Sequence, residues 1–526
     1  MAQGPGKRPG ASEPSLLVPG ETCWRTARAN RISFLVDSAA YFAVAMYALR
    51  RARRSIVLLG WGFDPRTRLN PGPHEEQDAP DEIGNLLKSL ARQRTDLDIR
   101  VLIWKSALPI SASQHFFPHR AREWFKGSPV RFRLDASVPY GACHHQKVLV
   151  IDDRVAFCGG GDFGIDRWDT PAHLDQDPRR IMPGGEHHEP RHEVMMMVDG
   201  EAARAFGDLA RARWMRSTGA AAPEPPKVVD MDPWPSWLPP DLEDADVSIA
   251  RTQPAWRTEG EVAEIEALHL AAIRGARRSI YLENQYFTSP SIGEALAARL
   301  SEPDGPEVAL ISSAHSPSYF DQMTMDRTRA DLLRKLKAAD IHGRFRAWFP
   351  RTTAGRPIIV HSKVAVIDDR LLRIGSANLN NRSAGFDTEC DVVIEAKTPE
   401  EEAAVARFRA FLIGHFAGVA PADAETVIRE KGLVGALDQL AAESAGKLSP
   451  LEPVSMGPLA SLIAAYHLGD PMDASDSWRP LLRRRRLRGE AALSALVSRS
   501  ESGSPPPAAG GRTPPAPAPR PKRVSR

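Results

Sequence analysis

The sequence predicts an α/β protein of two similar halves, each a mixed β-sheet flanked by helices, with the halves related by a pseudo-twofold axis. Three observations predict this fold class. The chain of 526 residues is too long for one ordinary hydrophobic core. Two segments occur twice in the same order, and strand-like runs alternate with helical patterns in both halves.

The first repeated segment pairs Arg53–Phe63 with Arg277–Phe287. Each copy follows apolar residues at three-to-four spacing, which indicates a helix that leads into a buried strand. In the first half this helix is expected over Ile32–Leu49, a run of about 18 residues that has the length of a membrane span. Because Asp37 interrupts the run and a strand-like segment follows directly, a buried helix is favoured over a span.

The second repeated segment pairs His145–Arg154 with His361–Arg370. Between the two repeats each half contains a further β-rich run and helical patterns, which are Ile99–Trp104, Val308–Ser312, Asp81–Arg94 and Thr324–Ala339. Two matches in the same order indicate that an α/β unit has been duplicated.

Composition suggests where the parts of the chain begin and end. We expect a flexible N-terminus over 1–25, a first half over 26–219, a Pro-rich linker over 220–245, a second half over 246–420, a helical extension over 421–499 and a tail over 500–526. The tail is rich in Pro, Gly, Ala and Arg, which cannot bury a core, so it is predicted to be disordered.

The bulk composition excludes several classes of protein. Hydrophobic residues make up 42% and charged residues 26%, as in ordinary globular proteins. The 69 Lys and Arg residues barely exceed the 66 Asp and Glu residues, so a basic groove and a nucleic-acid partner are not expected. The four cysteines form no C-x-x-C pair, which argues against a zinc ribbon or a disulfide framework. The first 25 residues lack the apolar run of a secretory signal, so we expect a cytoplasmic or peripheral membrane protein. We also expect a monomer.

The second repeat carries the residues that point to chemistry. In a strand, alternation puts His145 and Lys147 on one face and Asp152 on the other. The same parity separates the other histidine and lysine, His361 and Lys363, from Asp368. We take all six as the predicted catalytic set, although both aspartates lie at probable hairpin turns, where a structural role is favoured.

One His-x-Lys pair in a strand is unremarkable, whereas two pairs in duplicated halves could hold an anionic substrate between them. Cleavage of a phosphodiester needs a nucleophile, positive charge on the phosphoryl oxygens and an acid for the leaving alkoxide. One imidazole would attack phosphorus to give a phosphohistidine, and the other would protonate the leaving group and later activate water or an alcohol. Lys147 and Lys363 would neutralise the developing charge, and no metal or other cofactor is required.

The pattern His-x-Lys-x4-Asp, followed after six intervening residues by Gly-Ser-x-Asn, resembles the signature of the phospholipase D superfamily. The second half matches it in full with Gly375–Asn378, while the first half reads Gly159-Gly-Gly-Asp162. That form is similar to the first motif of eukaryotic-type phospholipases D, as is the segment Arg167–His173. The resemblance implies a duplicated phospholipase D fold with one active site at the interface of the halves.

The resemblance also implies roles for further residues. Ser376 and Asn378 would help to bind phosphate, with Asp162 at the corresponding place in the first half, and Glu389 would orient a histidine. Glu193 is its counterpart, in a segment where Arg191 replaces the expected tryptophan. His145 would be the nucleophile and His361 the acid, and the residues alone leave the reverse assignment open.

The preferred function is therefore a phospholipase D that acts on a phospholipid at a membrane surface. It would cleave the distal phosphodiester of a glycerophospholipid such as phosphatidylcholine, by hydrolysis or by transfer to an alcohol. Three alternatives remain: a cardiolipin synthase-type phosphatidyltransferase, a nuclease-like phosphodiesterase and a non-catalytic lipid-binding scaffold. His187, His188 and His192 lie in a loop rich in Gly, Glu and Pro and are expected to be solvated rather than metal ligands.

Overall fold

The computed structural model describes residues 14–72, 81–106, 117–227, 231–316, 322–453 and 469–471. The strands of the first half are β1 (Arg25–Val36), β2 (Ser55–Gly60), β3 (Asp98–Trp104), β4 (Arg131–Asp135), β5 (Val148–Ile151), β6 (Val155–Gly159), β7 (Arg191–His192) and β8 (Val194–Asp199). Those that follow are β9 (Leu242–Gln253), β10 (Val262–Ala263), β11 (Ser279–Asn284), β12 (Glu307–Ile311), β13 (Phe345–Pro350), β14 (Ile359–Val360), β15 (Lys363–Ile367), β16 (Leu371–Gly375), β17 (Glu389–Glu395) and β18 (Leu448–Pro450).

The strand order confirms the duplicated α/β fold. One half runs β4-β3-β2-β5-β6-β8-β1 and the other β13-β12-β11-β15-β16-β17-β9, so the order reads the same from either end. In both halves the first three strands are parallel and the others antiparallel. β18 extends the second half at its edge.

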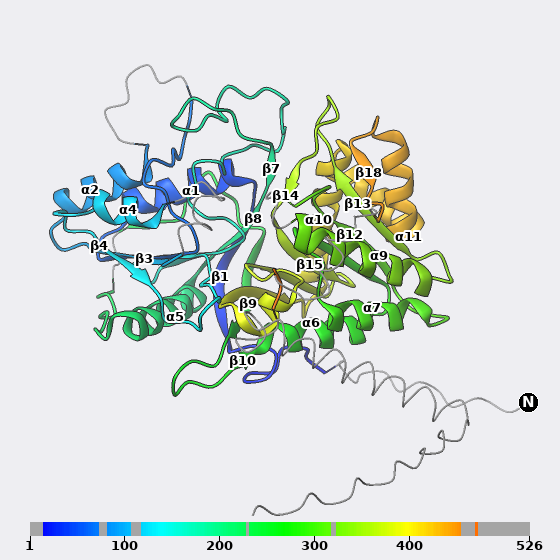
Figure 1. Ribbon diagram of the computed structural model, residues 1–526, viewed down its shortest axis with the longest axis horizontal. Coiled ribbons are helices and arrows are strands. Elements are labelled where there is room, and N and C mark those ends of the chain that lie inside the picture. The colour runs from blue at the N-terminus through cyan, green and yellow to red at the C-terminus, as the bar shows by residue number, and fades with distance from the viewer. Residues whose placement is uncertain are drawn as a thin grey trace, which may run out of the picture. The chain divides into compact units, whose positions relative to one another are not determined.

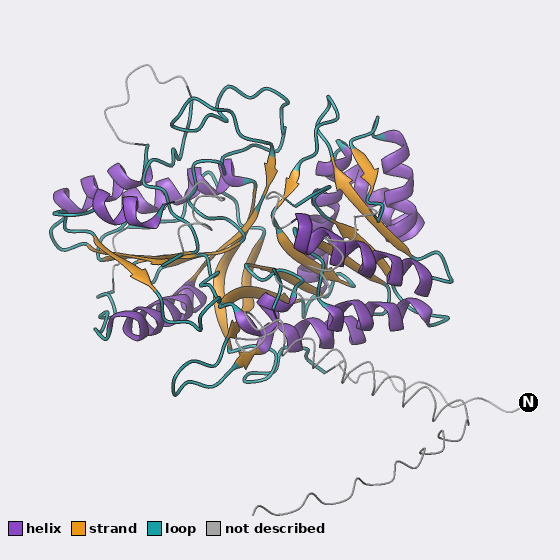
Figure 2. Ribbon diagram, in the orientation of Figure 1, coloured by secondary structure: helices purple, strands orange, loops and turns teal. Residues whose placement is uncertain are grey.

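The two predicted sheets are joined into one, because β1 and β9 pair with each other (Figure 2). Each of these strands has 12 residues, which is long for a strand. One end of β1 pairs with β8 and the other with β9, while β9 pairs in turn with β17. The length of these two strands is therefore what makes the sheet continuous.

Helices cover both faces of the sheet (Figure 1). In the first half α1 (Ser38–Arg51), α2 (Ile83–Gln93) and α4 (Pro118–Trp124) pack on one face, and α5 (Gly200–Thr218) packs on the other. In the second half α6 (Glu264–Gly275), α7 (Pro290–Ser301) and α9 (Arg327–Ala339) share one core, and α10 (Pro399–Ala417) and α11 (Pro421–Glu443) belong to another. That last core also contains α5, so one hydrophobic cluster serves both halves. Two short π-helical turns are η1 (Gln322–Asp326) and η2 (Arg382–Phe386).

The helix predicted over Ile32–Leu49 is wrong in its first part. Ile32–Val36 belongs to β1 and pairs with β8, and the helix begins only at Ser38. Asp37 lies between them with a φ of 65°, a left-handed backbone conformation that ends the strand. The apolar spacing could not separate a buried strand from a buried helix in this run.

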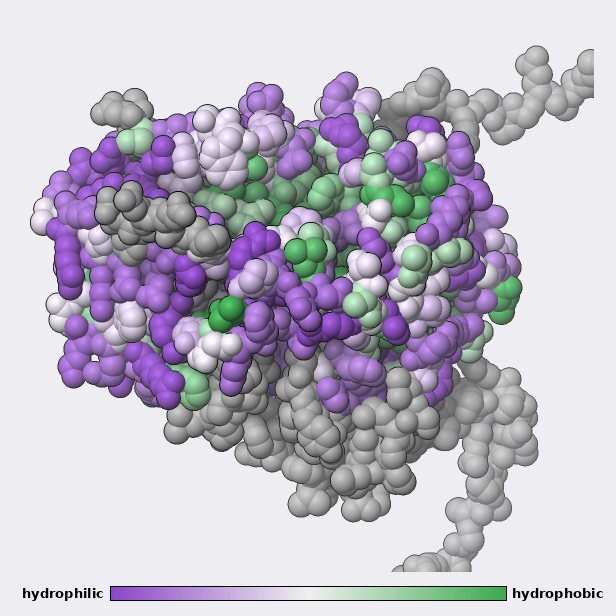
Figure 3. Space-filling view, turned by 90° about the horizontal axis from the view of Figure 1, so that it is seen from above, coloured by the Kyte–Doolittle hydropathy of each residue, from purple (hydrophilic) through white to green (hydrophobic). Residues whose placement is uncertain are grey.

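None of the helices in the described ranges is by itself long and apolar enough to cross a membrane, and α10 and α11 would meet that test only as a pair bent by 107°. Hydrophilic residues cover most of the face in Figure 3, with hydrophobic residues in small groups. The predicted tail over 500–526 and most of the predicted extension beyond α11 lie outside the described residues.

Candidate active site

The two histidine motifs meet where the halves meet. His145 lies just before β5 and His361 just before β15. The backbone N–H of His145 donates to the carbonyl oxygen of Thr388 at 2.9 Å, and that of His361 donates to the carbonyl oxygen of His192 at 2.9 Å. Each histidine is therefore fixed by a backbone segment of the opposite half.

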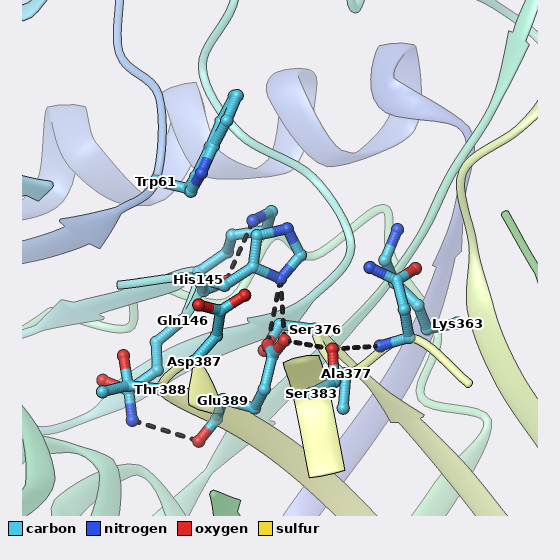
Figure 4. A network of polar contacts seen from close by, with 12 residues as sticks. Trp61, His145, Gln146, Lys363, Ser376, Ala377, Ser383, Asp387, Thr388 and Glu389 are labelled. Carbon is cyan, nitrogen blue, oxygen red and sulfur yellow. Dashed lines mark hydrogen bonds and ion pairs between the residues drawn. The ribbon is translucent and has the colours of Figure 1, made fainter. Parts of the chain in front are cut away.

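The residue that follows each of these segments is a glutamate, so the carboxylates pair with the histidines crosswise. His145 Nδ1 lies 3.1 and 3.0 Å from the two carboxylate oxygens of Glu389 (Figure 4). His361 Nδ1 lies 2.8 Å from Glu193 Oε1, although these two atoms are not aligned for a hydrogen bond. All four side chains are largely buried, with 14% and 11% of the two histidines exposed. A carboxylate at Nδ1 leaves Nε2 as the nitrogen available for chemistry.

The two carboxylates differ in what holds them. Ser376 Oγ donates to Glu389 Oε2 at 2.5 Å, and Ser383 Oγ donates to Oε1 at 2.6 Å. Neither oxygen of Glu193 accepts a hydrogen bond within the part of the chain that the structure describes. Gly160 occupies the place of Ser376, and a Cβ there would lie 2.9 Å from Glu193 Oε2. Ser376, predicted to bind phosphate, is instead turned toward Glu389.

Both lysines are buried beside their histidines. Lys147 Nζ donates to the carbonyl oxygen of His145 at 2.9 Å and lies 3.1 Å from Asp162 Oδ2. Lys363 Nζ donates to the carbonyl oxygen of His361. Asp162 therefore holds Lys147 through one oxygen, and its other oxygen accepts from the backbone N–H groups of Trp61 and Gly62.

Among the residues predicted to bind phosphate, Asn378 has a side-chain oxygen that accepts no hydrogen bond from the described residues. Its backbone N–H donates to Ser383 Oγ at 3.0 Å, and its Oδ1 is buried and accepts no hydrogen bond in the described residues. The oxygen of this amide cannot donate to a phosphoryl oxygen, so any contact with the phosphoryl group would be made by the amide NH2, which is a donor.

The inclusion of Asp152 and Asp368 among the catalytic residues is wrong. Asp152 accepts hydrogen bonds from the backbone N–H groups of Arg53, Arg54 and Ser55 at 2.6 to 2.7 Å. Asp368 accepts the equivalent three from Arg277, Arg278 and Ser279 at 2.6 to 2.8 Å. Both lie at the far end of their strand from the histidine, with φ of 55°. They tie the second repeated segment to the first and do not reach the site.

The electrostatics of the site favour neutral imidazoles. Burial lowers the pKa of both histidines well below its usual value, and the charges of Lys147 and Lys363 add to this at His145. Burial also lowers the pKa of Lys363 to about 7 and raises that of Glu389 to about 7. A bound phosphodiester anion would raise the pKa of a nearby imidazole, because opposite charge favours the protonated form.

Two buried arginines belong to the site although the sequence predicted no role for either of them. Arg167 and Arg191 are 6% and 5% exposed, and both approach Asp166, with nitrogen–oxygen distances of 2.9 and 3.7 Å. Their charges help to lower the pKa of His361. Two features of the sequence could have indicated these arginines: the Arg-Trp-Asp segment that begins at Arg167, and the presence of Arg191 where tryptophan is expected.

The expectation of a solvated histidine loop fails for two of its three members. His187 is exposed, but His188 is only 9% exposed and His192 is completely buried. His192 Nδ1 lies 2.9 Å from Asp37 Oδ1, and its Nε2 lies 3.1 Å from Glu283 Oε2. For His192 the reason is that β7 begins at Arg191 and pairs with β14 of the other half, which the loop composition could not indicate.

The fold is a duplicated α/β unit, and each half contributes one His-x-Lys motif and one carboxylate to a shared site. These features define a class of proteins whose active site contains two histidines. The chain belongs to the phospholipase D superfamily. The family model described as "Phospholipase D" matches residues 48–233, and the model described as "Cardiolipin synthase, PLD-like domain" matches residues 269–411.

Relatives agree with this membership, and a solved structure has a similar fold. Phospholipase D A of Dictyostelium discoideum is 25% identical over 415 residues, covering 67% of this chain and 32% of that protein. Phospholipase D1 of Saccharomyces cerevisiae is 25% identical over 459 residues, covering 69% and 26%. The chain thus spans about a third or less of their length. The phosphatidylserine synthase of Haemophilus influenzae has a similar fold, with a TM-score of 0.51 at 13% identity, covering 79% of this chain and 96% of that one.

Proposed function

We propose that this protein is a phospholipase D-type phosphodiesterase that cleaves the distal phosphodiester of a glycerophospholipid, such as phosphatidylcholine, through a phosphohistidine. The observation that carries the proposal is the crossed pairing of His145 with Glu389 and of His361 with Glu193. It gathers two oriented imidazoles and two buried lysines from both halves in one site. The relatives named phospholipase D support a phospholipid as the substrate.

The unequal support of the two carboxylates favours His145 as the nucleophile. Glu389, held by two hydroxyl groups, keeps the His145 ring in one orientation with the Nε2 lone pair free. Glu193 receives no hydrogen bond from the described residues, so its charge stays concentrated beside His361. A carboxylate whose charge is not shared stabilises an imidazolium more strongly, which suits the general acid.

In the first step His145 Nε2 attacks phosphorus, a P–N bond forms and the P–O bond to the head group breaks. The proton of the His361 imidazolium passes to the departing alkoxide, which leaves as a free alcohol. In the second step His361 takes a proton from water, whose oxygen attacks phosphorus and breaks the P–N bond. Phosphatidate leaves, and both histidines return to their starting states. Lys147, Lys363 and the amide of Asn378 stabilise the phosphoryl oxygens in both steps.

The first test is release of choline and phosphatidate from phosphatidylcholine vesicles. Wild type and His187→Ala, a change of an exposed histidine outside the site, should turn over the lipid equally. His145→Ala and His361→Ala should each lose at least about 1,000-fold in kcat. Equal rates for all four proteins on every phosphodiester tested would exclude catalysis by this site.

A second test separates the roles of the histidines. A phosphatidyl ester of p-nitrophenol has a leaving group that departs without protonation, so a missing acid matters less. It should restore much of the rate to His361→Ala and Glu193→Gln, and little to His145→Ala and Glu389→Gln. The opposite pattern of rescue would reverse the assignment.

Transfer of the phosphatidyl group is the second candidate. It is favoured by the family model described as "Cardiolipin synthase, PLD-like domain", which matches the second half. An alcohol would then replace water in the second step. Added phosphatidylglycerol should yield cardiolipin in preference to phosphatidate if transfer dominates. If no phospholipid is consumed, single-stranded DNA is the next substrate to test.

A further inference from the structure

We propose that Asp37, His173 and His415 bind a divalent transition-metal ion, with zinc the preferred ion, at a buried site separate from the two catalytic histidines. Nε2 of His173 and Nε2 of His415 lie 3.0 Å apart. Asp37 Oδ2 lies 3.6 Å from the first and 3.7 Å from the second. Tetrahedral zinc with bonds of about 2.0–2.1 Å places its donor atoms roughly 3.3 Å apart, so the three atoms already stand at the spacing of a metal triad.

In two of these ligands, the donor atom that faces away from the triad already has a hydrogen-bond partner. The other donor atom of each therefore points into the triad. His173 Nδ1 lies 2.8 Å from Asp169 Oδ2, and Asp37 Oδ1 lies 2.9 Å from His192 Nδ1. A histidine whose second nitrogen is held by a carboxylate is the usual arrangement around protein-bound zinc. His192, the fourth member of the cluster, lies within 4.8 Å of the other donors and fixes the carboxylate.

An unpartnered oxygen gives independent evidence of a missing ligand. Asp37 is completely buried, and its Oδ2 receives no hydrogen bond from the residues that the structure describes. A buried carboxylate oxygen without a partner is costly. A proton shared by the two Nε2 atoms would leave this oxygen beyond hydrogen-bond distance, whereas a metal ion would bind all three atoms.

The charge around the triad also fits a cation. The side chains that hydrogen-bond within and around the cluster include the carboxylates of Asp37, Asp169 and Glu283. Arg180, which donates to Asp169, is the guanidinium that enters this network among the described residues. The side chains of His173 and His415 are 5% and 3% exposed, so the triad is shielded from water.

The ligands come from both halves and lie next to the catalytic machinery. Asp37 precedes α1 and His173 lies in a loop of the first half, while His415 is in the last turn of α10 in the second half. The backbone N–H of Asp37 donates to the carbonyl oxygen of Glu193 at 2.8 Å, and the N–H of Glu193 returns to Asp37 Oδ1 at 3.3 Å. The metal would therefore be structural: it would fasten the halves and hold the backbone of the glutamate that faces His361.

The test is the metal content of the full-length protein without an affinity tag. After expression in zinc-supplemented medium and dialysis, mass spectrometry should find about one zinc per chain. His173→Gln and His415→Gln should each lose most of it, and His187→Gln should keep it. Zinc retained in both His173→Gln and His415→Gln, for instance at the catalytic histidines, would overturn the assignment.

A second measurement protects the test against variants that fail to fold. Zinc added to wild type stripped with chelator should raise Tm by at least about 4 °C, because the metal binds the folded state. Cobalt in its place, bound by the three side chains and one water molecule, should give the visible absorption of a four-coordinate ion, and His187→Gln should give the same spectrum. A wild type that contains no metal after expression, and whose Tm does not respond to zinc, would exclude the site.

Discussion

Two hydroxyl groups set the carboxylate beside His145 apart from the one beside His361. Ser376 and Ser383 both donate to Glu389, whereas Gly160 stands at the place of Ser376 in the first half. The difference is small in volume, but it decides how firmly each histidine is oriented. The two halves therefore present similar residues in unequal surroundings.

Removal of either hydroxyl group should weaken the orientation of His145. Ser376→Ala and Ser383→Ala should each lower kcat by about 10- to 150-fold with little change in KM, because loss of one hydrogen bond to a charged group costs about 1.5–3 kcal/mol. The double variant should lose less than the product of the two, since both hydroxyl groups hold one carboxylate. Ser316→Ala, which removes a buried hydroxyl bonded to Asp326, serves as the control and should leave kcat unchanged.

The titration of two buried groups predicts a narrow pH optimum. Burial raises the pKa of Glu389 to about 7, so falling pH protonates the carboxylate that orients His145. Burial and the charge of Lys147 lower the pKa of Lys363 to about 7, so rising pH removes a charge that the phosphoryl group needs. We expect kcat/KM on a soluble short-chain phospholipid to fall on both sides of about pH 7.

Lys363→Arg provides the check on the alkaline side. A guanidinium keeps its charge throughout this range, so the remaining activity of this variant should no longer fall as pH rises. A wild-type profile that is flat from about pH 5 to 9 would contradict the assignment of both groups.

At the level of single residues the sequence indicated the main groups and missed their supports. Strand parity separated His145 and Lys147 from Asp152, and the structure places that aspartate at the far end of the strand. Ser383 could not be found, because it approaches Glu389 only after η2 has folded next to β17. The same holds for the role of Ser376, since a signature does not say which way a hydroxyl group points.

At the scale of secondary-structure elements, the starts of β2 and β11 are held in place by the two turn aspartates. Asp152 and Asp368 each accept three backbone N–H groups at the start of β2 and β11. Asn retains the preference for a left-handed backbone but replaces one acceptor oxygen by a donor. The repeat in the sequence is thus explained by contact, because the two repeated segments hold each other in place.

Asp152→Asn should lower the free energy of unfolding by about 1.5–3 kcal/mol and change kcat by less than about threefold. Asp368→Asn should cost less, because Asp368 is more exposed than Asp152, which is only 6% exposed. Denaturant unfolding and choline release measured on the same preparations check both statements. A large loss of kcat in a folded Asp152→Asn protein would return the aspartate to the catalytic set.

The elements themselves were predictable where a pattern was unambiguous. Both copies of the first repeat lead into buried strands, β2 and β11, as their apolar runs indicated. The helix predicted before the first repeated segment began too early, because Ile32–Val36 forms a strand that pairs with β8, which is distant in the sequence. Local spacing carries no information on such pairing.

At the scale of the whole molecule the halves share one sheet and one hydrophobic cluster. We therefore expect a single calorimetric transition, with equal calorimetric and van't Hoff enthalpies, rather than separate unfolding of each half. Asp152→Asn and Asp368→Asn, one in each half, should shift the same transition. Two resolved transitions would show that the β1–β9 pairing does not couple the halves.

The sequence could reveal the duplication, but it could not reveal that the two halves form one continuous sheet. Nothing in β1 or β9 taken alone says that 12-residue strands will reach across to each other. The crossed glutamates were likewise beyond prediction, because a motif does not state which half its partner serves.

Because each glutamate orients the histidine of the other half, the sequences of the two halves cannot change independently during evolution. A substitution at Glu193 acts on a histidine encoded far downstream, and one at Glu389 acts on a histidine encoded far upstream. A chimaera that takes its first half from one relative and its second from another would therefore inherit two mismatched imidazole–carboxylate pairs. Its loss of activity should be recovered by exchanging the two short segments around the glutamates, without restoring either parental half.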